Sequence, residues 1–171
     1  MRQPPLTRIS TAAIAIAIVM ADQLTKAWAQ RALADGSIEI IEGFLTFRLT
    51  FNSGAAFSSF VGLGSVIAFL AVGISVFLWV AAARSERSGE WIVFALIIGG
   101  AMGNAIDRFL RGEGLADGSV VDFIDVGFIP VFNIADSAIT VGVVLALFLS
   151  FLPGAKPQSP DHETNDAPTA V

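Results

Sequence analysis

Residues 120–137, VVDFIDVGFIPVFNIADS, place three carboxylates and an asparagine between two apolar runs. Asp122 follows two valines, and Asp136 lies at the entrance to an uncharged segment that reaches Leu152. A carboxylate at hydrocarbon depth costs roughly 2.5–3.5 kcal/mol on insertion scales, so such residues are functional candidates by default. Two carboxylates close together could share a proton and activate water as an acid–base pair.

The rest of the chain is far more apolar than a soluble protein. Of its 171 residues, 54% are hydrophobic, and the mean hydropathy is +0.73. The apolar residues fall in four runs, at 9–29, 61–83, 91–110 and 134–152. The uncharged run 61–83 would span about 35 Å as a helix, enough to cross a bilayer core. We therefore expect a polytopic α-helical membrane protein with four transmembrane helices, a single domain over residues 1–154, and a disordered polar tail over 155–171.

Charge and composition exclude several classes of function. The net charge is −5, and no basic patch suggests a nucleic-acid partner. The chain has no cysteine, which excludes a disulfide, a thiolate nucleophile and a cysteine metal site. Its one histidine, His162, lies in the polar tail, which argues against histidine catalysis and a histidine-rich metal site. We expect neither a metal nor a cofactor.

Between the first two runs the periodicity changes. Residues 37–41 and 44–51 are rich in Ile, Phe and Thr, and Glu42-Gly43 lies between them, which predicts a short hairpin. In the second strand, threonine and arginine alternate with Phe47, Leu49 and Phe51, so one face of the sheet should be apolar and lie on the bilayer surface. The predicted fold is thus four transmembrane helices with a small β-hairpin at the membrane surface.

Four helices threaded up and down bring polar residues together. The end of the first helix, the start of the second, the end of the third and the start of the fourth share one membrane face. These segments carry the chain's intramembrane polar residues, namely Asp22, Lys26, Asn52, Asn104, Asp107, Arg108, Asn133 and Asp136. The opposite halves of the four predicted helices contain no charged residue. This convergence predicts a polar site at one face.

Some of these residues also have a purely structural interpretation. Asp22 and Lys26 are spaced i, i+4, as in a simple ion pair within a helix. Asn133 and Asp136 are spaced like an N-cap with an acidic third residue, which would start the fourth helix and can coexist with a catalytic role.

Other residues are equally open when only their spacing is considered. Asp107 and Arg108 could form an interfacial charge pair in which Arg108 snorkels to the surface. The Asn52-Ser-Gly sequence could be only a turn. Spacing does not rank Asp122 above Asp125. Nor does the positive-inside rule orient the chain, because five basic residues lie on each side of the predicted membrane.

The motifs NSGAAF (52–57), GGAMGNAIDR (99–108), VVDF (120–123) and FNIADS (132–137), in this order, closely resemble the lipoprotein signal peptidases of bacteria, the type II signal peptidases. The pair Asp22 and Lys26 matches as well. The resemblance implies a four-helix inner-membrane aspartic endopeptidase with both termini cytoplasmic, an active site near the outer leaflet, and a small β-cradle at the periplasmic surface. Its substrate would be a lipid-modified prolipoprotein, cut just before a diacylglyceryl-modified cysteine.

Matched motif by motif, the resemblance implies a role for each polar residue. Asp122 and Asp136 match the catalytic pair, and Asp125 does not. The residues implied to bind substrate are Asn52, Asn104, Arg108 and Asn133, and those implied to support the site are Asp22, Lys26 and Asp107. One departure is the link over residues 127–131, which is shorter than in many members of the family.

Three other functions remain as alternatives. A serine–lysine hydrolase would use Lys26 with Ser53 or Ser58. A proton-coupled transporter would relay protons through its carboxylates, although these occupy only one leaflet. A structural membrane adaptor would have no chemistry, but it gives no reason for so many ionisable groups at one depth.

Overall fold

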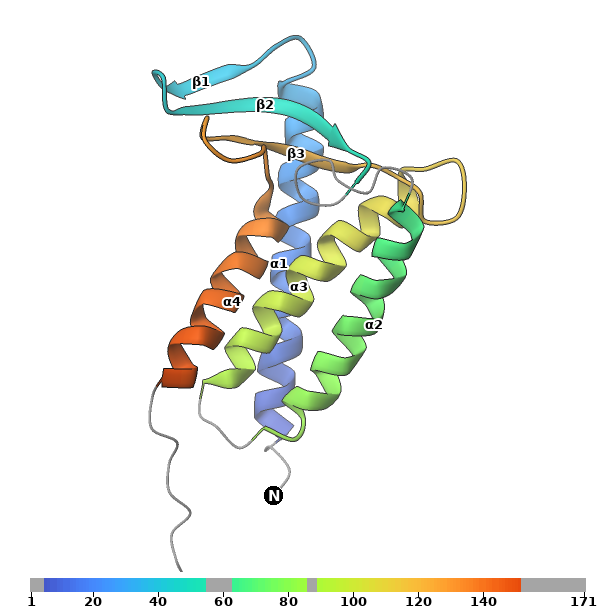
Figure 1. Cartoon of the computed structure of the whole chain (residues 1–171), viewed down its shortest axis with the longest axis vertical. Coiled ribbons are helices and arrows are strands. Elements are labelled where there is room, and N and C mark those ends of the chain that lie inside the picture. The colour runs from blue at the N-terminus through green and yellow to red at the C-terminus, as the bar shows by residue number, and fades with distance from the viewer. Residues whose placement is uncertain (1–4, 55–62, 86–88, 152–171) are drawn as a thin grey trace, which may run out of the picture.

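The computed structural model describes residues 5–54, 63–85 and 89–151, and four helices account for most of them (Figure 1). They are α1 (Pro5–Ala32), α2 (Gly64–Ala82), α3 (Glu90–Leu110) and α4 (Ile134–Phe151). All four are long and apolar enough to cross a membrane, as predicted. The first and third begin earlier than expected, so Arg8 and Glu90 lie inside helices at the end where charges were not expected. Residues 61, 62 and 152 of the predicted runs, and the tail 155–171, lie outside the described residues.

Helix α3 is the centre of the bundle and packs against α1, α2 and α4 (Figure 1). Glycines on α3 allow the close approach. A Cβ atom built on Gly99 would lie 2.9 Å from the Ala15 carbonyl oxygen of α1, and one on Gly100 would lie 2.4 Å from the Ala135 carbonyl oxygen of α4. Gly103, four residues after Gly99, also leaves no room for a side chain, because its Cβ would lie 2.7 Å from Asp22 Oδ2 of α1.

A three-stranded antiparallel sheet lies across the end of the bundle opposite the N-terminus (Figure 1). The predicted hairpin is formed by β1 (Ile38–Ile41) and β2 (Leu45–Asn52). The third strand, β3 (Val120–Asp125), was not foreseen, and it pairs with β2 so that Thr50 lies opposite Asp122. Strand β3 thereby carries Asp122 to the end of the bundle where α4 begins.

Aromatic packing fixes the sheet on α1. The rings of Trp28, Phe47 and Phe123 meet edge to face, with centroids 5.6–6.1 Å apart. Phe47 and Leu49 pack on the buried cluster as the alternation predicts, but Phe51 is 56% exposed. The register of β2 against β3 shifts between Phe47 and Thr50, so strict alternation does not extend along the whole strand.

Candidate active site

Asp122 is held from two sides in a buried position. Its side chain lies in β3 and is 2% exposed. The Asn52 amide of β2 donates a hydrogen bond to Oδ2 over 3.2 Å, and the Asn133 amide donates one to Oδ1 over 2.7 Å. Asn52 also accepts the Gly54 N–H at 3.0 Å, so the same side chain closes a turn and contacts Asp122.

Asp136 lies in the first turn of α4 and caps it. Its backbone N–H donates to Asn133 Oδ1 at 2.9 Å, and the Asn133 N–H donates to Asp136 Oδ2 at 3.2 Å. This reciprocal pair is the capping arrangement that the spacing predicted. Because the Asn133 side chain also reaches Asp122, the cap and the site are built from the same residue.

Asn104 of α3 binds Oδ1 of Asp136, the carboxylate oxygen that the cap does not use. Its Nδ2 donates to Asp136 Oδ1 at 2.7 Å. Its Oδ1 accepts hydrogen bonds from Lys26 Nζ at 2.9 Å and from Asn133 Nδ2 at 3.0 Å. The two donors on one side of the amide fix its orientation, so the NH₂ group is directed at Asp136.

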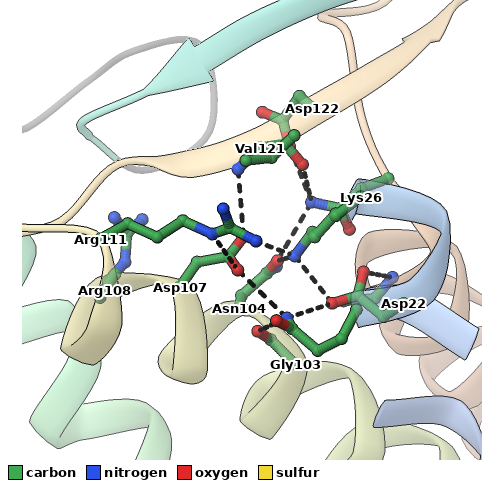
Figure 2. Close-up of polar contacts among 12 residues, drawn as sticks. Asp22, Lys26, Gly103, Asn104, Asp107, Arg108, Arg111, Val121 and Asp122 are labelled. Atoms are coloured by element: carbon green, nitrogen blue, oxygen red, sulfur yellow. Dashed lines mark hydrogen bonds and ion pairs between the residues drawn. The ribbon is translucent and has the colours of Figure 1, made fainter. Parts of the chain in front are cut away.

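Lys26 contacts more residues than its ion-pair partner within α1. Its ammonium lies 2.8 Å from Asp22 Oδ2 and 2.9 Å from Asp107 Oδ2, and all three side chains are fully buried (Figure 2). With Asn104, the lysine therefore has three acceptors for its three N–H groups. Its position joins α1 to α3.

Arg108 does not form the charge pair with Asp107 that their spacing left open. Asp107 pairs instead with Lys26 and with Arg111, whose Nε lies 2.8 Å away. The Arg108 guanidinium is directed at loop carbonyls, with Nη2 donating to Gly54 O at 2.6 Å and Nη1 to Gly118 O at 3.4 Å. Its 5% exposure rules out the snorkelling interpretation, because the loops supply the partners that water would have supplied.

Two residues of the cluster were not foreseen. The Gln23 amide donates to Asp22, to Asp107 and to the Gly103 carbonyl, each over 3.1 Å. Arg111 also donates to the Gln30 side chain at 2.7 Å. The i, i+4 spacing of Asp107 and Arg111 was a usable signal, whereas nothing in the sequence indicates the three contacts of Gln23.

Asp125 lies apart from this cluster. Arg48 donates to its Oδ2 from Nη2 at 2.6 Å and from Nε at 3.0 Å, and the Gly127 N–H donates to Oδ1 at 2.9 Å. The Gly127 hydrogen bond, and then the bonds from Arg48, lower the pKa of this carboxyl. The structure thus separates Asp122 from Asp125, which spacing alone did not.

A cavity of about 830 Å³ opens beside the two aspartates. It lies among α2, α3, α4 and the segment 129–132, and its polar lining includes Asp122, Asp136, Asn52, Asn104 and Arg108. Most of the remaining wall is apolar. Asn133, Asp22, Lys26 and Asp107 lie behind the pair rather than on this wall, so Asn133 is better placed to hold the aspartates than to contact a substrate.

The electrostatics at Asp122 suit acid–base chemistry. Burial, followed by the negative charge of Asp136, raises the pKa of Asp122 to about 7, and hydrogen bonds from Asn52 and Asn133 oppose that rise. The negative charge of Asp136 thus favours the protonated form of Asp122. Within the described residues, no group of three or more His, Cys, Asp or Glu side chains is placed to hold a metal ion.

A family profile and individual relatives identify the same protein family. The profile of the signal peptidase (SPase) II family matches residues 14–152. A lipoprotein signal peptidase of Rhodococcus jostii is 39% identical over 141 residues, which cover 81% of this chain and 71% of that protein. One of Bifidobacterium adolescentis is 42% identical over 142 residues, covering 82% and 75%.

Solved structures agree with the sequence relatives. A bacterial membrane enzyme structure determined by the in meso method at 2.3 Å resolution superposes with a TM-score of 0.72 at 31% identity, covering 82% of this chain and 87% of that one. A second, at 1.9 Å resolution, gives a TM-score of 0.69 at 31% identity, covering 83% and 92%.

Proposed function

The chain belongs to the lipoprotein signal peptidase (signal peptidase II) family of bacterial membrane proteases, and on that basis we propose that it is an aspartic endopeptidase with Asp122 and Asp136 as its catalytic pair. It removes the signal peptide from a prolipoprotein by cutting just before a diacylglyceryl-modified cysteine. One observation carries the proposal: Asn133 donates its side-chain N–H to Asp122 and its backbone N–H to Asp136, and both carboxyls line one cavity.

The proposed chemistry divides the two carboxyls into an acid and a base. Asp122, with its pKa raised to about 7, carries the shared proton, which leaves Asp136 to act as general base. Asp136 takes a proton from water as the water oxygen bonds to the scissile carbonyl carbon, and Asp122 protonates the carbonyl oxygen. When the C–N bond breaks, Asp136 gives its proton to the leaving amine, and Asp122 recovers its own from the intermediate.

The cavity walls suit a lipidated peptide. Arg108, Asn104 and Asn52 are polar groups on the wall beside the pair, where they can hold peptide carbonyls in register with the aspartates. Leu70 and Ile74 of α2 and Val141 of α4 line the cavity and are 42–59% exposed, so the cavity presents an open apolar wall. An acyl chain can therefore remain among lipid chains while the peptide bond reaches the pair.

We further propose that both termini are cytoplasmic and that the sheet and site face outward from the bacterial inner membrane. The start of α1 and the end of α4 lie at the same end of the bundle, away from the sheet (Figure 1). Because the chain has no native cysteine, a single cysteine at Gly43 can be labelled by an impermeant maleimide on intact cells with no background. Labelling there, and none at a cysteine replacing Ser85, is the expected result; the reverse pattern would invert the orientation.

The proposed peptidase domain is residues 1–154, with 155–171 outside it.

The serine–lysine alternative does not fit the cluster. All three N–H groups of Lys26 are engaged by Asp22, Asp107 and Asn104, and the lysine side chain is fully buried. Ser53 is exposed, and Ser58 lies outside the described residues. A buried lysine whose amino group is held by three acceptors is not placed to activate a serine.

Cleavage of a diacylated prolipoprotein and of its unlipidated form by purified protein tests the proposal. Wild type should cut the lipidated substrate, Asp136→Asn should bind it without cutting, and Asp125→Asn should cut as wild type does. Asp125 is the matched control because it is a carboxylate of the same segment with its own partner, Arg48. Cleavage by Asp136→Asn at the wild-type rate would refute the assignment of the pair.

A further inference from the structure

Two backbone hydrogen bonds place the catalytic aspartates. Asp107 Oδ2 accepts the N–H of Val121 at 3.1 Å, and Asp22 Oδ1 accepts the N–H of Ala135 at 3.0 Å. Val121 immediately precedes Asp122, and Ala135 immediately precedes Asp136. A buried carboxylate on α3 therefore holds the backbone of β3 beside one catalytic residue, and a buried carboxylate on α1 holds the backbone of α4 beside the other.

Lys26 connects these two carboxylates. Its Nζ lies 2.8 Å from Asp22 and 2.9 Å from Asp107, and Arg111 Nε continues the series with 2.8 Å to the other oxygen of Asp107 (Figure 2). The four charges alternate in sign along the line from Asp22 to Arg111. The first three side chains are fully buried, and that of Arg111 is 26% exposed.

We propose that Asp22, Lys26, Asp107 and Arg111 form a four-charge clamp that sets the separation of the two catalytic carboxyls through the backbone N–H preceding each one. The clamp residues are positioning residues, because they line no part of the cavity and contact neither catalytic side chain directly. The inference rests on the proposed catalytic roles of Asp122 and Asp136. It assigns to Arg111 a role in the reaction that its place on the rim of the cluster does not suggest.

The clamp lies where α3 approaches α1 closely. A Cβ atom on Gly103 of α3 would lie 2.7 Å from Asp22 Oδ2, so the absence of a side chain there makes room for the carboxylate. Gln23 ties the two carboxylates together from the same side through hydrogen bonds of 3.1 Å to each. Catalytic groups must be held to within roughly 0.5 Å, and a displacement of about 1 Å can cost about 10²-fold in rate.

Arg111 balances the charge of the clamp. Without it, the clamp holds two carboxylates and one ammonium, and Asp107 Oδ1 loses its 2.8 Å hydrogen bond from Arg111 and keeps the 3.1 Å hydrogen bond from Gln23. Asp107 can then rotate and carry the Val121 N–H with it. Because the Arg111 side chain is partly exposed, its removal leaves no buried cavity, so the Arg111→Met protein should fold.

The test compares Arg111→Met with the control Arg48→Met. Arg48 is also ion-paired to an aspartate, but it lies outside the clamp. For Arg111→Met, kcat on lipidated substrate should fall about tenfold while KM stays within about twofold, because the cavity wall is unchanged. Arg48→Met should match wild type in kcat. A purely structural role for Arg111 would lower the yield of folded protein without changing kcat per folded molecule.

A second readout needs no cleavage. The carboxyl band of Asp122, identified by its absence in Asp122→Asn, can be followed by infrared titration. The charged groups facing Asp122 are Asp136 from α4, Arg108 from α3 and Lys26 from α1. A loosened clamp lets the carboxyls separate and admits water, so the midpoint in Arg111→Met should fall by about one pH unit.

A charge-balanced double variant, Asp22→Asn/Lys26→Met, removes the centre of the clamp but keeps an oxygen for the Ala135 N–H. It should lose at least about 10²-fold in kcat and show the same downward shift of the Asp122 midpoint. Retention of wild-type kcat and midpoint in both variants would overturn the clamp, and a double variant that does not fold would assign these residues to folding instead. An unaffected Arg111→Met beside a defective double variant would remove Arg111 from the clamp. If wild type does not cut lipidated substrate, the proposed function fails, and the midpoints still decide the clamp.

Discussion

Replacing Asp122 by asparagine should change the free energy of unfolding in opposite directions at acidic and at basic pH. Burial and the charge of Asp136 raise the pKa of this carboxyl from 3.8 to about 7. The folded state therefore binds the proton more tightly than the unfolded state, so the stabilisation is complete below about pH 4 and is lost as the pH rises through about 7. A shift of about three pH units corresponds to roughly 4 kcal/mol.

Asparagine does not titrate, so it avoids this pH-dependent loss of stability, but its NH₂ group destabilises the folded protein at every pH. Both oxygens of Asp122 accept amide N–H groups, from Asn52 and Asn133. The NH₂ group of an asparagine would face one of these donors, which costs about 1–3 kcal/mol at a buried position. The variant should therefore be less stable than wild type at pH 4 and more stable at pH 8, by about 1–3 kcal/mol at the higher pH.

Reversible unfolding in mixed micelles at pH 4 and pH 8 measures both differences. Asp125→Asn is the control of opposite sign, because the pKa of Asp125 is lowered and its stabilisation is lost as the pH falls rather than as it rises. A free-energy difference between Asp122→Asn and wild type that is the same at both pH values would refute the reasoning. It would mean that the proton of Asp122 is bound equally well in the folded and unfolded states.

Three further predictions concern the rate and the packing. In wild type, kcat should fall above about pH 7 as Asp122 loses the proton it donates, which a pH–rate profile on lipidated substrate measures. Gly100→Ala should destabilise the protein by about 1–3 kcal/mol and lower kcat, because its Cβ would lie 2.4 Å from the Ala135 carbonyl oxygen; Gly73→Ala, which meets no atom within 4 Å, should do neither. Ser53→Ala should retain cleavage within about twofold, and loss of cleavage there would restore the serine–lysine mechanism.

The helices and the hairpin could be predicted because their signals are local. Long uncharged runs identify spans by length alone, and the alternation around Phe47 identifies a strand without knowledge of its partner. Strand β3 lacks such a signal. Its sequence is short, apolar and unalternating, and its partner β2 is distant in the sequence, so only the pairing of Thr50 with Asp122 reveals it.

The site could be located from topology but not assembled from it. Threading four helices up and down was enough to bring Asp22, Asn104 and Asp136 to one face. The same reasoning brought Arg108 to this face, where it lines the cavity. It could not identify the hydrogen-bond partners of Arg108, because the Gly54 and Gly118 carbonyls lie in loops whose paths the sequence does not predict. Asn133 shows why local interpretations need not compete: the hydrogen bonds that cap α4 and the one that holds Asp122 use different atoms of the same residue.

The ionised groups behind Asp122 and Asp136 are an expensive way to hold a bundle together. Replacing a buried ion pair by apolar side chains of similar volume is often neutral or stabilising. In this chain no buried side-chain N or O atom of the described residues lacks a hydrogen-bond partner, so the cost is offset but not removed. A proton pathway would need such groups along the bilayer, whereas Asp22, Lys26 and Asp107 meet beneath the sheet and hold the backbone beside the aspartates. Their placement fits the proposed reaction better than it fits a role in stability.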